Sequence, residues 1–201
     1  MASVISTYIS HSMRTINFYY NTPNIMFAFG RQSPWGTLPG DNVGNLIYNE
    51  YKPPLPTLDA ENLQEIIGYK RPEKMQFVIP DNVGAYKVDG IWWNIVKPTT
   101  SETNPDIIKK LTIEEVKRLK CRWVYLTVTI EGNEFINTTY RQVGLFSDLK
   151  VNYANGGTDN QALYNENEIF PGSGVLEAYQ NRKMILRQSD QREKFAFVLE
   201  F

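Results

Sequence analysis

The residue types that most often carry catalysis are scarce in this chain. It has one histidine, His11, and one cysteine, Cys121, and neither has an evident catalytic partner nearby in sequence. For His11 we expect a place on a helix surface or at a helix cap rather than the role of a general base. A histidine-dependent triad and a zinc site each need more such side chains, so the sequence argues against both.

The serines and glycines form no known catalytic or phosphate-binding motif. Ser33 and Ser173 lie outside any G-x-S-x-G elbow, and Gly172-Ser173-Gly174 is predicted to be only a turn. The chain has neither a Walker loop nor a G-x-G-x-x-G motif, so nothing indicates a nucleotide site.

Carboxylates are the remaining residues with catalytic potential. Glu134 together with one loop carboxylate could in principle hydrolyse a glycosidic bond. The loop carboxylates considered are Asp148, Asp159, Glu166 and Glu168. Such residues are plentiful in the loops of soluble proteins, and the loop at 157–160 offers too few oxygen ligands for calcium. We therefore predict a protein without enzymatic activity, cofactor or metal.

Length and composition predict a folded, mixed-charge protein. The chain has 201 residues, 42% of them apolar and 13% aromatic, and a formal net charge of −1. We expect one domain over residues 1–201 and no nucleic-acid partner, because nucleic-acid binders usually carry a basic stripe. A lone cysteine excludes an intrachain disulfide and fits folding in a reducing cytoplasm. No apolar run is long enough to span a membrane, and the first residues do not look like a signal peptide.

The chain is organised around one apolar stretch and the corner that follows it. Ile25–Phe29 is continuously apolar, which predicts a strand buried on both faces. It ends at Gly30-Arg31 and a Pro34-Trp35 corner, where proline prevents further strand pairing. The guanidinium of Arg31 could bind several loop carbonyls or a carboxylate.

Periodicity and turn signals place the other elements. Helical spacing predicts a helix over Ala2–Tyr20 capped by Ser3, a second over Leu58–Ile67 before Gly68, and a short one after Thr112. Strands are expected at 75–79, 85–88, 91–96, 123–130, 137–148 and 195–201, with a hairpin of 175–180 and 183–188 around Asn181-Arg182.

Three further segments have distinctive composition. The run Pro53–Pro56 predicts a rigid surface track, or alternatively a polyproline ligand for the groove of another protein. Residues 97–111 are expected to form a mobile loop, and Asn152–Asn167 a solvated loop. Trp92 and Trp93 should point to opposite faces of their strand.

Several stretches, in this order, carry a resemblance to a known family. They are Arg14-Thr15 with Asn17–Tyr19, Phe27–Arg31 with Pro34-Trp35, Pro53–Thr57, Val78–Pro80, Tyr140–Gly144, Gly174–Leu176 with Tyr179, Asn181-Arg182 and Ile185, and Phe195–Phe201. Together they make the chain similar to the dimeric β-sandwich wedge subunit of the baseplate of contractile-tailed bacteriophages, the myovirus baseplate wedge protein family. The chain is shorter than the coliphage relative, and its segment Lys97–Lys120 has no counterpart there. Insertions on that relative would make contacts that are missing here, so its partners do not carry over directly.

The resemblance implies a fold, a place and a role. The fold would be mainly β (α+β), an antiparallel β-sandwich-like core with an N-terminal helix and one or two short helices in loops. The chain would pair as a homodimer and join other wedge proteins in the sixfold plate of the virion tail, assembled in the host cytoplasm. That plate changes arrangement when the tail contracts. Arg31, Trp35 and Arg141 would be structural anchors, because a charge in an apolar strand is tolerated only when paired.

A role in assembly also suggests which side chains contact other subunits. Aromatic residues contribute strongly to protein interfaces, so the interface candidates are Leu38, Tyr48, Tyr51, Trp92 and Trp93. A receptor- or glycan-binding tail module stays open as an alternative, because such modules use similar folds. A tail-associated glycosidase is a third hypothesis and would need a carboxylate pair in a cleft.

Overall fold

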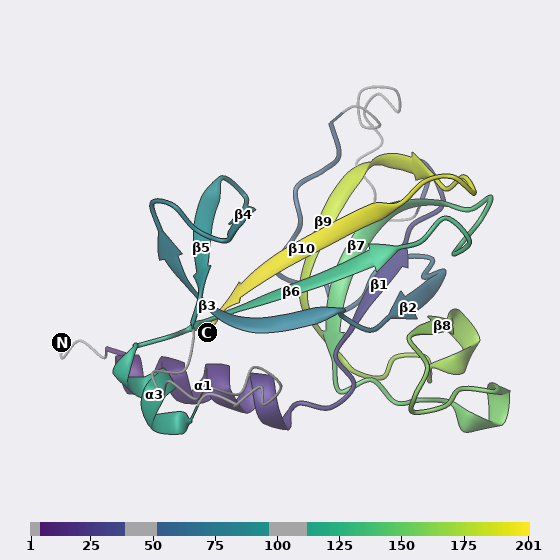
Figure 1. The fold of residues 1–201 in the computed structure, drawn as a ribbon. Helices are drawn as coiled ribbons and strands as arrows, with labels where there is room; N and C mark the ends of the chain where they lie inside the picture. The colour runs from purple at the N-terminus through teal and green to yellow at the C-terminus, as the bar shows by residue number, and fades with distance from the viewer. Residues whose placement is uncertain (1–4, 39–51, 97–111) are drawn as a thin grey trace. The chain divides into compact units, whose positions relative to one another are not determined.

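The computed structural model describes residues 5–38, 52–96 and 112–201 and folds them mainly into β-strands (Figure 1). The strands form two five-stranded sheets, with the orders β8-β2-β1-β7-β9 and β10-β6-β3-β5-β4. Helix α1 precedes the first strand, and short helices occupy some connections. The predicted mainly β, α+β fold with antiparallel strands, an N-terminal helix and short helices in loops is confirmed.

Backbone contacts divide the chain into two compact units. One contains α1, α3 and most of the β10-β6-β3-β5-β4 sheet, and the other contains the β8-β2-β1-β7-β9 sheet. One domain over residues 1–201 stays a prediction, and the loop expected at 97–111 lies outside the described residues. The helices that the structure describes are all too short or too polar to cross a bilayer.

Helix α1 spans Tyr8–Asn21, so it begins later than the Ala2 predicted from helical spacing. Thr7 is its N-cap, with an extended backbone and a side chain that accepts a hydrogen bond from the Ser10 N–H at 3.2 Å. A capping threonine satisfies a free N–H group of the first turn and so fixes where the helix starts. Ser3, the cap expected from sequence, lies outside the described residues.

Helix α3, Ile113–Arg118, packs against α1 and starts where the sequence predicts. Thr112 and Glu115 form a capping box, in which each side chain bonds to the backbone N–H of the other residue. The second of these contacts, from the Thr112 N–H to the Glu115 carboxylate, is 2.8 Å long. The predicted short helix after Thr112 is therefore confirmed.

The sheet in this unit has a short hairpin at one edge. Its strands are β3 (Lys74–Asp81), β4 (Tyr86–Val88), β5 (Ile91–Ile95), β6 (Trp123–Ile130) and β10 (Glu193–Glu200). Asp89 and Gly90 join β4 to β5 with φ of 49° and 84°, the left-handed pair that a two-residue hairpin turn requires. The predicted hairpin is confirmed, and so are the opposite orientations of Trp92, 38% exposed, and Trp93, 6% exposed.

The second sheet carries the apolar stretch around which the chain is organised. Its strands are β1 (Met26–Gly30), β2 (Gly68–Lys70), β7 (Thr139–Ser147), β8 (Leu163–Asn165) and β9 (Val175–Leu186), with short 3₁₀ helices at Tyr153–Asn155 and Glu166–Glu168. Every residue of β1 is buried, as predicted for a strand covered on both faces. Met26, Ala28, Tyr69, Phe146 and Tyr164 belong to one core cluster of this unit.

The helix predicted over Leu58–Ile67 is wrong. Its backbone groups bond to the end of β1 instead of to one another: the Arg31 N–H donates to Gln64 O, and the Ile67 N–H donates to Phe29 O at 2.8 Å. Glu65 has a φ of 45°, outside the right-handed helical region. Helical spacing alone could not reveal these strand-end partners, which become available only in the folded sheet.

Two other predictions for this sheet need correction. The hairpin expected around Asn181-Arg182 is one continuous strand, β9, whose extra residues are absorbed as irregularities in its pairing with β7. The solvated loop expected at Asn152–Asn167 includes strand β8, and the Tyr164 side chain is fully buried in the core.

Candidate functional site

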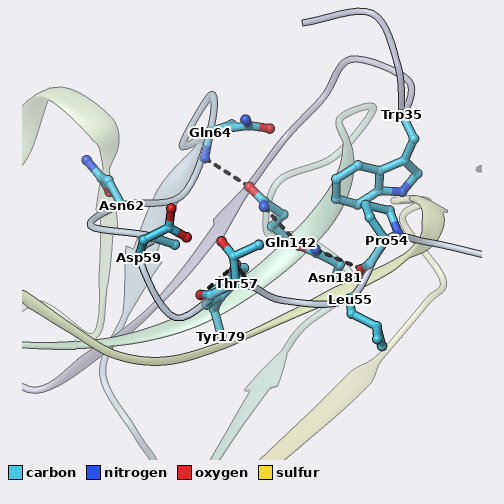
Figure 2. A pocket seen from close by; sticks show the side chains of 11 residues that line it. Trp35, Pro54, Leu55, Thr57, Asp59, Asn62, Gln64, Gln142, Tyr179 and Asn181 are labelled. Carbon is cyan, nitrogen blue, oxygen red and sulfur yellow. Dashed lines mark hydrogen bonds between the residues drawn. The ribbon is translucent and has the colours of Figure 1, made fainter. Parts of the chain in front are cut away.

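The proline track, defined as Pro53–Thr57, is tied to strand β9 by hydrogen bonds (Figure 2). The Asn181 side-chain N–H donates to the Pro54 carbonyl at 2.9 Å, and the Thr57 N–H donates to the Tyr179 hydroxyl at 2.6 Å. That hydroxyl in turn lies 3.3 Å from Thr57 O. Because proline fixes φ and restricts the preceding residue, the track is stiff even before these bonds form.

A relay of amide side chains extends the same attachment across the sheet. The Gln64 N–H donates to Gln142 Oε1 at 2.9 Å, and Gln142 Nε2 donates to Asn181 Oδ1 at 2.9 Å (Figure 2). Gln142 and Asn181 face each other on β7 and β9. Gln142 is 5% exposed, so its amide is a buried polar group with partners on both atoms.

A cavity of about 580 Å³ opens beside the track. Its lining is mostly polar and consists of Trp35, Pro54, Leu55, Thr57, Asp59, Ala60, Asn62, Gln64, Gln142, Tyr179 and Asn181 (Figure 2). The relay amides already bond to one another and to the backbone. The arrangement is therefore suited to holding a surface segment in place rather than to acid–base chemistry.

Arg31 lies at the corner next to this cavity and is fully buried. Its guanidinium donates to Pro34 O at 2.8 Å and to the Gln64 side-chain oxygen, and it stacks 4.1 Å from the centre of the Trp35 ring. The Trp35 N–H donates to the Arg182 carbonyl of β9 at 3.1 Å. These contacts join the corner to two other segments; the anchor role of Arg31 and Trp35 stays a prediction.

A carboxylate completes the same corner. Glu65 accepts hydrogen bonds from the Ser33 N–H at 2.7 Å and from the Ser33 hydroxyl at 2.6 Å. Burial alone would raise the pKa of Glu65, but these bonds and the charge of Arg31 outweigh it, so the pKa is lowered. Arg141, the third predicted anchor, is 4% exposed and donates to the Gln32 carbonyl of the segment before this corner.

The interface candidates lie in different environments. Leu38 is half-buried, whereas Tyr48 and Tyr51 lie outside the described residues. Trp92 exposes part of its ring, with the Lys87 ammonium 5.3 Å from the ring centre, and Trp93 is buried in an apolar cluster. Their assignment to interfaces stays a prediction.

Three of the five carboxylates considered for glycoside chemistry have partners in the fold. Glu134 forms an ion pair with Lys70 at 2.6 Å, and Asp159 accepts a hydrogen bond from the Tyr153 hydroxyl at 2.7 Å. Glu168 accepts from the Asn165 N–H at 2.7 Å, and Asp148 and Glu166 are exposed. Within the described residues no cluster of three or more carboxylate, histidine or cysteine side chains could hold a metal ion.

His11 and Cys121 each contact a backbone carbonyl oxygen within the fold. The His11 Nδ1 atom lies 2.5 Å from the Phe201 carbonyl oxygen, a contact between the first helix and the last residue. The Cys121 thiol is fully buried and donates to Val78 O at 3.3 Å. Burial raises the pKa of this thiol, which disfavours the reactive thiolate.

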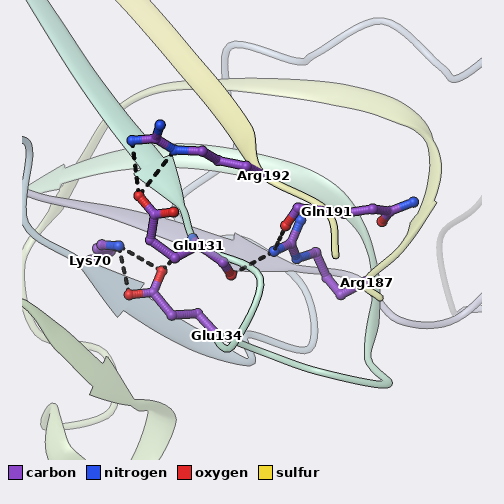
Figure 3. Close-up of polar contacts among 6 residues, drawn as sticks. All are labelled: Lys70, Glu131, Glu134, Arg187, Gln191 and Arg192. Atoms are coloured by element: carbon purple, nitrogen blue, oxygen red, sulfur yellow. Dashed lines mark hydrogen bonds and ion pairs between the residues drawn. The ribbon is translucent and has the colours of Figure 1, made fainter. Parts of the chain in front are cut away.

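Sequence reasoning missed a buried charge network at the β6–β7 and β9–β10 turns. Arg187 is fully buried and donates to Glu131 O at 2.7 Å and to Gln191 O at 2.8 Å (Figure 3). Its guanidinium also lies 3.4 Å from the Glu193 carboxylate. The sequence gives little signal for this role, because Arg187 stands in a polar stretch typical of an exposed turn.

The residues drawn in Figure 3 bind backbone groups and one another across two turns. Such contacts stabilise the turns and leave none of these residues placed for catalysis.

The whole chain, residues 1–201, matches the model of a protein family described as "Baseplate wedge 3 tail fiber network component". The chain belongs to this family. The chain is also similar to "Virion protein 3" of Enterococcus phage phiEF24C, at 25% identity over 201 residues, which cover 98% of this chain and 95% of that protein.

The family membership confirms the resemblance to phage baseplate wedge proteins. This chain is a structural component of a phage tail, located in the virion. The stretches that carry the resemblance include residues whose side chains form hydrogen bonds within the fold, such as Arg31 at its corner and the amides of Gln142 and Asn181.

Proposed function

We propose that this chain is a wedge subunit that links neighbouring wedge proteins in the sixfold baseplate and takes part in its rearrangement when the tail contracts. The full-length match to a baseplate wedge family is the observation that carries the proposal. A subunit in such a plate must keep the shape of its contact segments while its neighbours move. Rigid segments also lose less conformational entropy on binding, so they bind more tightly for the same contacts.

The contacts around the proline track support this role. The track, the Arg31 corner and the segment at Gln64 are each tied to a strand or to one another by hydrogen bonds. Buried bonds between side chains and loop backbone hold irregular segments without regular secondary structure. These loops can therefore serve as fixed contact surfaces.

An exposed apolar stripe supports association with another chain. Ile5, Ile9 and Met13 are 81%, 60% and 40% exposed. The last two are four residues apart in α1 and so share a face of the helix. We propose a homodimer and other baseplate wedge proteins as partners, since an isolated chain would leave these side chains in water.

We propose that the protein has no enzymatic activity. The ion pair of Glu134 with Lys70 and the capping bonds of Glu168 occupy two of the candidate carboxylates. A glycosidase would need one such group free to donate a proton and the other free to attack or activate water.

A glycan- or receptor-binding module is the second candidate function. Trp92 is partly exposed and lies opposite Asp81 in the β3–β5 pairing, and Asp81 accepts a hydrogen bond from Asn94 at 2.5 Å. An aromatic ring beside a carboxylate and an amide can stack on a sugar and bind its hydroxyls. Loss of binding to a glycan array in Trp92→Ala would support this function, and no binding by the unchanged protein would refute it.

The proposed function is tested by light scattering after size exclusion. The purified protein is measured alone and mixed with the other recombinant wedge proteins of the same phage. We expect a dimer that enters a stable complex containing different wedge chains. A monomer that elutes separately from every wedge protein would contradict the proposal.

A further inference from the structure

The proline track and the turn after it present two leucine side chains that the fold leaves in solvent. Leu55 is 86% exposed and Leu58 is 109% exposed, the latter in a turn directly after the track. Both are large apolar residues, and neither belongs to a core cluster of the described residues. Their exposure needs an explanation because leucine gains free energy when buried.

The backbone beneath these leucines is held in position. Pro53, Pro54 and Pro56 fix three φ angles and favour polyproline II geometry in the residues before them. Hydrogen bonds at Pro54 O and at the Thr57 N–H tie the track to Asn181 and Tyr179. The segment is therefore preorganised and would lose little conformational entropy on binding.

The spacing of the leucines matches the repeat of this conformation. A polyproline II helix has three residues per turn, so residues three apart lie on one edge, about 9 Å from each other. Leu55 and Leu58 are three apart, φ is negative from Pro53 to Leu58, and Leu58 begins the turn that follows the track. Two exposed leucine side chains on and directly after a tied, proline-rich segment fit a groove with two apolar pockets.

We propose that Leu55 on the proline track, with Leu58 directly after it, inserts into an aromatic-lined groove of a different protein of the tail. This inference rests on the proposed function, because it names the kind of partner surface that the wedge subunit contacts. Aromatic-lined grooves are the recurrent binding sites for polyproline II segments. Proline rings and leucine side chains would pack on the aromatic faces of such a groove.

A second copy of this chain fits less well as the partner. The cavity beside the track is lined by amide groups of Asn62, Gln64, Gln142 and Asn181 (Figure 2). A neighbouring cavity of about 420 Å³ is lined by Pro53, Gln180, Asn181, Arg182, Lys183 and Ile185. Leucine side chains placed in such cavities would displace water from polar groups without replacing their hydrogen bonds.

The test places a photo-reactive benzophenone amino acid at position 55 in the phage that encodes this chain. Purified tails are irradiated, and the cross-linked peptides are identified by mass spectrometry. The same label at Val83, which is 79% exposed and far from the track in sequence, is the matched control. We expect position 55 to cross-link to one segment of a different tail protein that contains aromatic residues, and position 83 not to reach that segment.

Each other outcome overturns the inference in a recognisable way. Cross-links from position 55 to a second copy of this chain, to a segment without aromatic residues, or to nothing would refute the groove. Those results would leave the proposed function intact, because the labelled chain would still be present in the tails. Absence of the unlabelled chain from purified tails would instead refute the proposed function.

A double variant gives an independent readout. Leu55→Ser with Leu58→Ser should unfold at the same temperature as the unchanged protein, because both side chains are exposed. We expect its incorporation into tails to fall at least tenfold in competition with the unchanged chain. The free energy gained by burying even one leucine side chain corresponds to about a tenfold change in affinity. Equal incorporation would contradict the inference, and Val83→Ser is the control that should incorporate normally.

Discussion

Arg187 offers the sharpest test of how the turns of this protein are held. The substitution Arg187→Ala removes a fully buried guanidinium that donates to two carbonyls (Figure 3). The same guanidinium faces the Glu193 carboxylate. The carbonyls belong to Glu131 in the β6–β7 turn and Gln191 in the β9–β10 turn. One change therefore breaks a connection between two turns that are distant in sequence.

The magnitude follows from the groups left behind. Each buried carbonyl without its donor costs about 1–3 kcal/mol, and breaking a buried ion pair typically costs about 3–5 kcal/mol. These costs overlap, and the Glu193 side chain is 23% exposed, so water can partly solvate its carboxylate. We expect Arg187→Ala to lower the free energy of unfolding by about 3–5 kcal/mol.

Urea unfolding followed by circular dichroism measures this loss. With a slope of about 3 kcal/mol per molar urea, the unfolding midpoint should fall by roughly 1–2 M. The matched control is Arg192→Ala, five residues away in the same turn. Arg192 also pairs with a carboxylate, Glu131 at 3.1 Å, but its side chain is 69% exposed. An exposed pair contributes about 0–1 kcal/mol, so the control midpoint should hardly move.

Comparing the two arginine variants tests whether burial determines how much each arginine contributes to stability. Equal midpoints for Arg187→Ala and Arg192→Ala would refute the reasoning, because burial would then make no difference to the strength of these contacts. A loss in Arg187→Ala that Arg187→Lys fully restores would also contradict it. Lysine supplies the charge but not the planar fork that reaches two carbonyls at once.

Three further predictions concern the second sheet and its corner. Arg31→Ala should lower the free energy of unfolding by about 2–4 kcal/mol, measured by urea unfolding, and an unchanged value would show that Arg31 is no anchor. Gly68→Ala should cost about 1–3 kcal/mol, since a Cβ there would lie 2.6 Å from the Phe135 ring; Gly172→Ala, with open space but a φ of +67°, should cost only about 1–2 kcal/mol. Burial, helped by the charge of Glu166, raises the pKa of Tyr69 to about 12. Tyr69 should therefore contribute stability below about pH 10 that is lost as the pH rises through 12, and the absorbance difference from Tyr69→Phe during alkaline titration should show this ionisation.

The sequence predicts well the elements whose signals are local. The Asp89-Gly90 turn, the capping box at Thr112 and the continuous apolar run of β1 each depend on residues that are neighbours in the chain. Backbone preference and side-chain burial then act over a few residues, and the pattern shows both. The family resemblance similarly rested on short stretches in a fixed order.

The sequence predicts poorly what depends on distant partners. The segment before Gly68 has helical spacing, but its backbone bonds to the end of β1, and no local pattern contains that information. Asn181 looks like a turn residue, yet its amide belongs to the relay with Gln142 and Pro54. Buried polar groups such as Arg187 look like exposed ones until the fold brings their partners together.

The central claim is that this chain is a wedge subunit of the tail baseplate. A cryo-electron microscopy map of the intact tail tip of the encoding phage tests it most directly. We expect both five-stranded sheets of the chain to fit density at six symmetry-related sets of positions in the plate, in contact with other wedge proteins. Density for the chain only on fibres outside the plate, or a plate fully explained by other proteins, would contradict the claim.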